Sequence, residues 1–137
     1  MSTPSNQHYI WSLPIGAVVR VSHGWYDHVG LMGDNICRGE RTVVSFSARA
    51  GGFTEEPFSA FASGQQVAID GYPGALPPQS VMQRACLKQG RSYSWTEFNC
   101  EHFVRYAHGV PIESPQLRQW ASLGGVLGCV AFALVRA

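Results

Sequence analysis

The stretch Asn99-Cys100-Glu101-His102-Phe103-Val104 places a thiol at the beginning of a predicted amphipathic helix over residues 100–107. His108-Gly109 follows and is typical of a helix end. The N-terminus of a helix carries partial positive charge and unpaired N–H groups, which favour a thiolate over a thiol. Cys100 is therefore a candidate nucleophile, provided that a histidine elsewhere in the chain accepts its proton.

Length and composition limit what surrounds this stretch. At 137 residues the chain is long enough for one domain with a core of its own. Only 14% of the residues are charged, and 15 glycines with 8 prolines favour a compact, turn-rich fold. A net charge of +1 gives no electrostatic basis for binding nucleic acid, so no nucleic-acid partner is expected.

The cysteines and the N-terminal residues indicate an intracellular setting. Met1–His8 is polar and lacks the basic and apolar segments of a secretory signal peptide. The cysteines show neither a CxxC pair nor metal-ligand spacing, so we expect free thiols, no metal and no cofactor. The four are Cys37, Cys86, Cys100 and Cys129.

Hydrophobic patterning predicts an α+β fold with a small antiparallel sheet, because strands come mainly first and helices mainly later. Gly33-Asp34-Asn35 is expected to form a hairpin turn, Glu55-Glu56 to begin a helix, and Ser80 to cap another. The expected strands cover residues 16–21, 28–32, 42–47, 53–54 and 67–69, and the expected helices cover 55–62, 80–88 and 100–107.

The histidines differ in their fitness to act as the base. His102 lies two residues after Cys100, so on a helix the two side chains point in different directions. His28 begins an apolar strand, from whose end an imidazole can project toward a helix N-terminus. His23 is the weaker candidate because it lies earlier in the presumed loop, and His8 and His108 are expected to have no catalytic role.

Two blocks of the chain resemble the lecithin:retinol acyltransferase-like family. The segment from Gly16 to Leu31, which contains Tyr26-Asp27-His28-Val29-Gly30, is similar to its first histidine box, and Gly90 to Val104 is similar to its asparagine–cysteine box. The resemblance implies a permuted papain-like fold related to NlpC-type hydrolases, with a helix bearing the cysteine packed on the sheet. It implies Cys100 as nucleophile and His28 as general base, in a catalytic domain over residues 1–119 whose core begins near residue 14.

The position that orients the imidazole departs from the family pattern. Family members usually place a second histidine or another polar residue on the next strand, and Ser45 is the best match there. A serine hydroxyl accepts a hydrogen bond from the other ring nitrogen more weakly than imidazole or carboxylate does. Ser47 and His23 are alternatives for the same role, since Ser47 shares a strand face with Ser45.

The family resemblance, taken with these residues, implies three candidate functions. The first is a cysteine-dependent acyltransferase or acyl hydrolase that takes an acyl chain from a phospholipid or another acyl ester or amide, through a thioester on Cys100. The second is an NlpC-type thiol peptidase or amidase that uses the same residues. The third is a non-catalytic interaction protein that keeps the fold, which the loss of the orienting histidine supports.

The C-terminal segment, residues 120–137, has a different character. Leu123 to Val135 contains no charged residue, and these 13 residues fall short of the roughly 20 that cross a bilayer as a helix. The segment is expected to form either a buried core helix or a membrane-associated segment. Trp120 and the flanking arginines, Arg118 and Arg136, suit the second interpretation.

Overall fold

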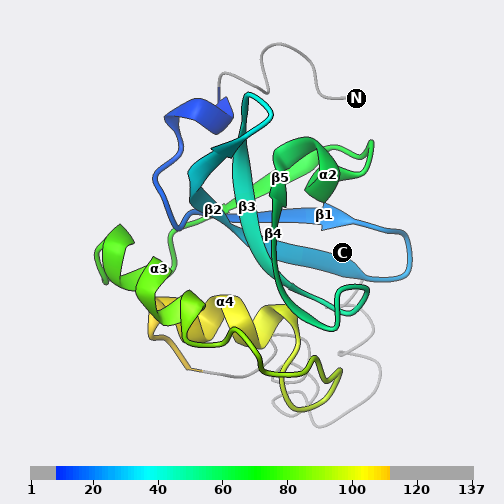
Figure 1. Cartoon of the computed structure of the whole chain (residues 1–137), viewed down its shortest axis with the longest axis vertical. Helices are drawn as coiled ribbons and strands as arrows, with labels where there is room; N and C mark the ends of the chain where they lie inside the picture. The colour runs from blue at the N-terminus through cyan, green and yellow to red at the C-terminus, as the bar shows by residue number, and fades with distance from the viewer. Residues whose placement is uncertain (1–8, 112–137) are drawn as a thin grey trace, which may run out of the picture.

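The computed structural model of the chain describes residues 9–111 (Figure 1). One antiparallel sheet holds five strands in the order β4-β3-β2-β1-β5, which confirms the predicted α+β class. A single helical turn over residues 9–12 precedes the sheet. The strands are β1 (Val18–Ser22), β2 (Asp27–Cys37), β3 (Glu40–Ser47), β4 (Gly52–Pro57) and β5 (Val67–Gly71), and the helices are α2 (Phe58–Ala62), α3 (Pro78–Cys86) and α4 (Cys100–His108).

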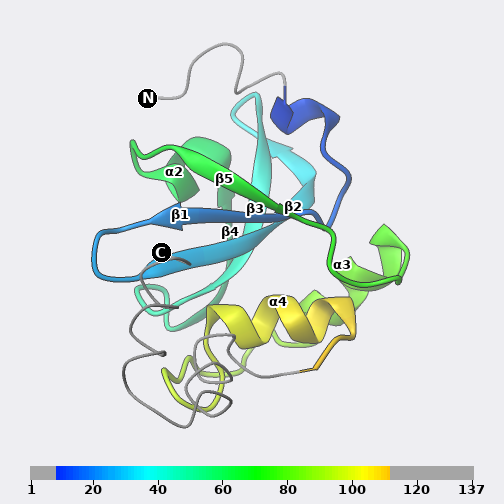
Figure 2. The same ribbon diagram turned by 180° about the vertical axis from the view of Figure 1, so that it is seen from behind.

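Helices lie on both sides of the sheet (Figures 1 and 2), and alternation along β2 assigns its side chains to one side or the other. Val29 and Leu31 belong to the core cluster shared with α3 and α4. Met32 belongs to the second cluster, shared with Phe61 of α2. A Cβ on Gly30 would lie 2.7 Å from Val43 Cγ1 and 3.1 Å from the Phe61 ring, which puts Gly30 on the α2 side as well.

The hairpin turn between β2 and β3 lies later in the chain than predicted. Gly33-Asp34-Asn35 is part of β2, where the ladder is irregular between Met32 and Ile36, so its expected role as the turn is wrong. The turn is formed by Arg38 and Gly39, whose φ angles of 55° and 79° are both positive. Two-residue hairpin loops need this backbone because its twist matches that of the flanking strands.

The segment expected to be a helix over 55–62 is a strand followed by one helical turn. Glu55 and Glu56 pair with Val44 and Val43 in β4, so their predicted role at a helix start is wrong. Glu55 instead accepts hydrogen bonds from the Thr42 hydroxyl at 2.7 Å and from the Asn35 side-chain amide at 2.9 Å. These cross-strand partners outweigh the weak helical pattern of a short segment.

The two later helices follow the prediction with one correction. α3 begins at Pro78 and not with a Ser80 cap, because proline at the first helical position has a preset φ and needs no N–H partner. α4 covers the predicted residues and ends at Gly109, whose φ of 69° is the left-handed conformation of a C-terminal cap.

Between residues 9 and 111 there is no helix that combines the length and the apolar character of a membrane span. The segment 120–137 lies outside the described residues.

Candidate active site

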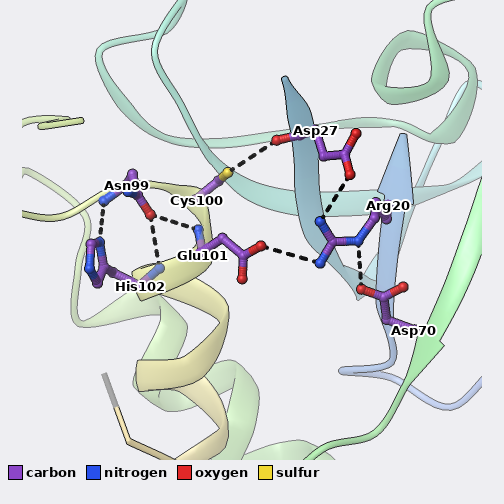
Figure 3. A network of polar contacts seen from close by, with 7 residues as sticks. All are labelled: Arg20, Asp27, Asp70, Asn99, Cys100, Glu101 and His102. Atoms are coloured by element: carbon purple, nitrogen blue, oxygen red, sulfur yellow. Dashed lines mark hydrogen bonds and ion pairs between the residues drawn. The ribbon is translucent and has the colours of Figure 1, made fainter. Parts of the chain in front are cut away.

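The first turn of α4 is closed by a reciprocal cap on Asn99. The Asn99 side-chain oxygen accepts hydrogen bonds from the backbone N–H groups of Glu101 at 3.0 Å and His102 at 3.1 Å. The Asn99 N–H donates in return to Nδ1 of His102 at 3.0 Å (Figure 3). This is a capping box, with histidine in the place of the usual Glu or Gln. His102 is thus engaged in holding the helix end, which explains why it does not face Cys100.

Cys100 is the first residue of α4 and is buried, with 6% of its surface exposed. Its thiol donates a long hydrogen bond of 3.9 Å to the backbone carbonyl of Asp27. Burial raises the pKa of the thiol to about 11, although backbone hydrogen bonds and the Arg20 charge act in the other direction. In the described conformation Cys100 is therefore a protonated thiol at neutral pH.

Arg20 joins three strands to the beginning of α4 (Figure 3). Its guanidinium contacts Asp70 at 2.8 Å, Glu101 at 3.3 Å and Asp27 at 3.4 Å. Burial by itself lowers the pKa of Arg20, but the three carboxylates outweigh it and the pKa is raised. The sequence interpretation missed this residue, although a single charge inside the apolar run Gly16–Val21 is the signal of a buried ion pair.

Tyr93 is a second neighbour of Cys100 that the sequence did not reveal. Burial raises the pKa of its hydroxyl, and the proximity of Cys100 adds to the shift, while a hydrogen bond with the Cys100 backbone opposes it. A tyrosine in a loop carries no periodic signal, so only the folded chain shows that it lies beside the thiol. Cys100 thus lies between Asp27 on the sheet and Tyr93 in the loop that precedes α4.

His28 lies on the side of the sheet opposite to Cys100. Its ring centroid is 5.2 Å from that of Phe61 in α2 and 6.3 Å from that of His23. Together with Arg49, these residues line a pocket of about 250 Å³. Burial lowers the pKa of His28 to about 4, with further contributions from His23 and Arg49, so the imidazole is neutral at pH 7.

Ser45 shares the side of the sheet on which His28 lies. It pairs with Gly30, which is two residues beyond His28 on β2, and it is fully buried. Its hydroxyl has no hydrogen-bond partner among the described residues. The structure therefore brings His28 and Ser45 to one face and Cys100 to the other, and within residues 9–111 no hydrogen bond or ring contact joins Cys100 to His28.

Comparison with protein families assigns this arrangement to a known group. Residues 11–109, most of the chain, match the family model of lecithin retinol acyltransferase. The chain belongs to the lecithin retinol acyltransferase family. This membership, within the NlpC/papain-like superfamily, agrees with the observed sheet and helices and confirms the resemblance seen in the two sequence blocks. A search of curated proteins gives no match to the chain.

Membership in the lecithin retinol acyltransferase family supports cysteine-based acyl transfer or hydrolysis. The structure places Cys100 at the first residue of a capped helix and His28 near the beginning of β2. The described cysteines, Cys37, Cys86 and Cys100, are all free. Residues 9–111 contain no group of three or more His, Cys, Asp or Glu side chains arranged to hold a metal ion.

Proposed function

We propose that the protein is a cysteine-dependent acyltransferase or acyl hydrolase that uses Cys100 as its nucleophile. The observation that carries the proposal is the position of Cys100 at the first residue of a capped helix, inside the segment that matches the family. The acyl donor is an ester or amide, with a phospholipid as the leading substrate class. No metal or cofactor takes part in the proposed reaction.

The reaction proceeds through two acyl transfers. His28 takes the proton of Cys100, and the thiolate attacks the substrate carbonyl to form a tetrahedral oxyanion. The oxyanion collapses, the bond to the alcohol or amine breaks, and the imidazolium returns its proton to that leaving group. Water, an amine or an alcohol then attacks the thioester while His28 accepts a proton from it, and Cys100 is released as a thiol.

This proposal requires His28 to approach Cys100. The pairing of β2 with β3 begins at Gly30, so residues 27–29 are held in the sheet through β1 alone. The connection before β2 contains Gly24, whose φ of 91° belongs to the left-handed region. In the proposed mechanism the described arrangement is the resting one, and substrate binding reorients the beginning of β2.

A non-catalytic interaction protein is the second candidate. The separation of His28 from Cys100 on opposite faces favours it, as do the raised pKa of the thiol and the lowered pKa of the imidazole. Both pKa shifts stabilise the neutral thiol and the neutral imidazole, so they make proton transfer from Cys100 to His28 less favourable. The two candidates differ in one measurable property, the ability of Cys100 to take an acyl group.

The deciding experiment is mass spectrometry of the full chain after incubation with phospholipid vesicles. We expect an acyl adduct on Cys100 that is absent in Cys100→Ser and retained in Cys86→Ser, because Cys86 is an exposed thiol at the end of α3. His28→Gln is expected to abolish the adduct while leaving the protein folded. An adduct that survives in His28→Gln would remove His28 from the mechanism.

Absence of any adduct in the wild-type chain needs a second assay. Cleavage of short peptides that depends on Cys100 would then assign the protein to the thiol peptidases or amidases. If neither lipid nor peptide reacts, while alkylation at alkaline pH proves that Cys100 is intact, the non-catalytic candidate replaces the proposal.

A further inference from the structure

Four aromatic side chains form a partly exposed surface, here called the aromatic rim: Trp25, Tyr26, Tyr93 and Trp95. Trp25 is 78% exposed and Trp95 is 52% exposed, yet their ring centroids lie only 5.9 Å apart. Tyr26 contacts both tryptophans, at 4.5 and 5.8 Å, and Tyr93 lies 5.2 Å from Trp95. The rim thus joins the loop before β2 to the loop before α4.

The aromatic rim is continuous with the surroundings of Cys100. The backbone carbonyl of Trp95 accepts a hydrogen bond of 2.8 Å from the Asn99 side chain that caps α4. Tyr26 is followed by Asp27, whose carbonyl accepts the hydrogen bond of the thiol. Tyr93 contacts the Cys100 backbone directly. Both loops that carry the rim therefore meet at the candidate nucleophile.

The residue types of the rim indicate what it binds. Tryptophan and tyrosine combine an apolar ring with a polar group, and both concentrate at the interface between lipid headgroups and acyl chains. Two neighbouring tryptophans that remain exposed in a folded domain keep a large apolar area in water, and contact with a lipid surface would bury it.

Cations flank the rim on two sides. Arg49 and Trp25 line the same pocket, together with Glu56. Arg91 and Lys88 lie over the ring of Phe98, at 4.4 and 5.4 Å, at the end of the loop that carries Trp95 and Glu97. Arg49, Arg91 and Lys88 are thus available to contact anionic headgroups.

We propose that the aromatic rim is a docking surface for a phospholipid bilayer, with Trp25 and Trp95 inserted at the headgroup level. Docking there brings the loops on both sides of Cys100 to the lipid, where acyl esters are present at high local concentration. The choice of lipid as partner rests on the proposed acyl-transfer function. The docking itself needs no contribution from residues 120–135.

Vesicle co-sedimentation of the full chain tests this surface. The vesicles consist of phosphatidylcholine with a minority of phosphatidylserine. We expect Trp25→Ala/Trp95→Ala to weaken vesicle affinity roughly tenfold or more, because the variant removes both apolar indole rings that the bilayer would bury. Trp11→Ala is the matched control, because Trp11 is 53% exposed on the helical turn at 9–12, which lies at the other end of the molecule from α4 (Figure 1).

A spectroscopic measurement covers the case in which the double alanine variant does not fold. The chain has four tryptophans, so Trp11→Phe/Trp120→Phe leaves only Trp25 and Trp95 to fluoresce. We expect vesicles with brominated acyl chains to quench this fluorescence. Unchanged vesicle affinity in the folded Trp25→Ala/Trp95→Ala variant, or absence of quenching, would overturn the proposal.

Cys100→Ser separates this inference from the proposed function. We expect the variant to bind vesicles as the wild type does, because the serine leaves the rim intact. A protein that docks through the rim but forms no acyl adduct would refute acyl transfer from phospholipid and keep the docking surface. A protein that forms the adduct and binds equally well without its rim tryptophans would refute the docking surface alone.

Discussion

Ser45 brings a hydroxyl into the sheet without giving it a partner. A buried hydroxyl that has lost water and gained no hydrogen bond lowers the free energy of unfolding. We therefore expect Ser45→Ala to be neutral or up to about 1 kcal/mol more stable than the wild type in urea denaturation. Thr42→Val is the control, because the Thr42 hydroxyl donates to Glu55 at 2.7 Å and its loss is expected to destabilise by about 1 kcal/mol.

The same Ser45→Ala variant tests the predicted role of the serine. If Ser45 orients His28 during catalysis, the variant forms the Cys100 adduct more slowly although it is at least as stable. Equal stability together with an equal rate of adduct formation would show that Ser45 takes no part. A marked loss of stability would contradict the absence of a hydrogen-bond partner in the described structure.

Arg20 concentrates more charge contacts than any other residue of the described chain segment, with three carboxylates around one guanidinium. We expect Arg20→Met to lower the free energy of unfolding by about 3–5 kcal/mol, because it leaves partly buried carboxylates facing one another. Arg20→Lys keeps the charge but loses the planar fork, so an intermediate loss is expected. Urea denaturation at neutral pH measures both variants.

Arg41→Met provides the comparison for Arg20. Arg41 is also buried, but it donates to the backbone carbonyls of Ile10, Leu13 and Gly33 rather than to carboxylates. Its removal is expected to destabilise the protein without changing the pH at which Cys100 is alkylated. Arg20→Met is expected to move that pH upward, since the Arg20 charge lowers the pKa of Cys100. An identical alkylation profile in both variants would argue against this electrostatic role.

At the scale of the element, α4 depends on its cap. Asn99→Ala removes the acceptor for two N–H groups and the donor to Trp95, so we expect a loss of about 1–2 kcal/mol. Ser80→Ala is the matched control: the pattern predicts Ser80 as a cap, but α3 begins at Pro78 without a side-chain cap. The melting temperatures of the two variants measure the difference. Equal destabilisation would contradict the assignment of Asn99 as a helix cap and of Ser80 as a residue without that role.

The elements show why a sequence predicts some features and misses others. Asn99, the apolar side of α4 and Gly109 act locally within one helix, so the sequence contains all the relevant information. The hairpin is different, because Gly33-Asp34-Asn35 and Arg38-Gly39 are both plausible turns. Pairing between β2 and β3 selects the second, and the face on which Ser45 lies depends on that register.

The candidate site likewise combines features that the local sequence predicts with features that depend on tertiary packing. The sequence predicts Cys100 from its own helix and from the family resemblance. The contacts of Arg20 with Asp70 and Glu101 join residues 50 and 81 positions apart, and no periodicity encodes them. The face on which His28 lies relative to Cys100 depends on how α4 packs against the sheet. It is therefore a property of the packed domain and not of the strand.

At the scale of the whole molecule, buried titratable groups define a pH range of greatest stability. The pKa of His28 is about 4 in the fold against an ordinary 6.5, so between these values the unfolded chain binds more protons and stability falls as pH decreases. The pKa of Cys100 is about 11 against an ordinary 9.0, so the fold holds the proton longer and stability falls as pH rises above 9. We expect maximal stability between about pH 6.5 and 9.

Two variants show which residues cause the loss of stability at the acid and alkaline limbs of this pH profile. His28→Gln is expected to flatten part of the acid limb, and the lowered pKa values of His102 and His108 also contribute to this limb. Cys100→Ser is expected to flatten part of the alkaline limb, to which Tyr93 also contributes. Urea denaturation at a series of pH values measures each limb. A limb that keeps its full slope in the corresponding variant would contradict the burial of that group.

α4 is attached to the rest of the molecule at both ends. Its first turn is fixed by Asn99 and by the contact of Glu101 with Arg20, and at its last residue Nε2 of His108 lies 2.7 Å from the carbonyl of Gly16. A nine-residue helix moves as a rigid rod of about 13 Å. The ring of His108 is consequently a remote reporter of the thiol: its NMR resonances should respond when Cys100 is acylated, although it is buried at the other end of the helix.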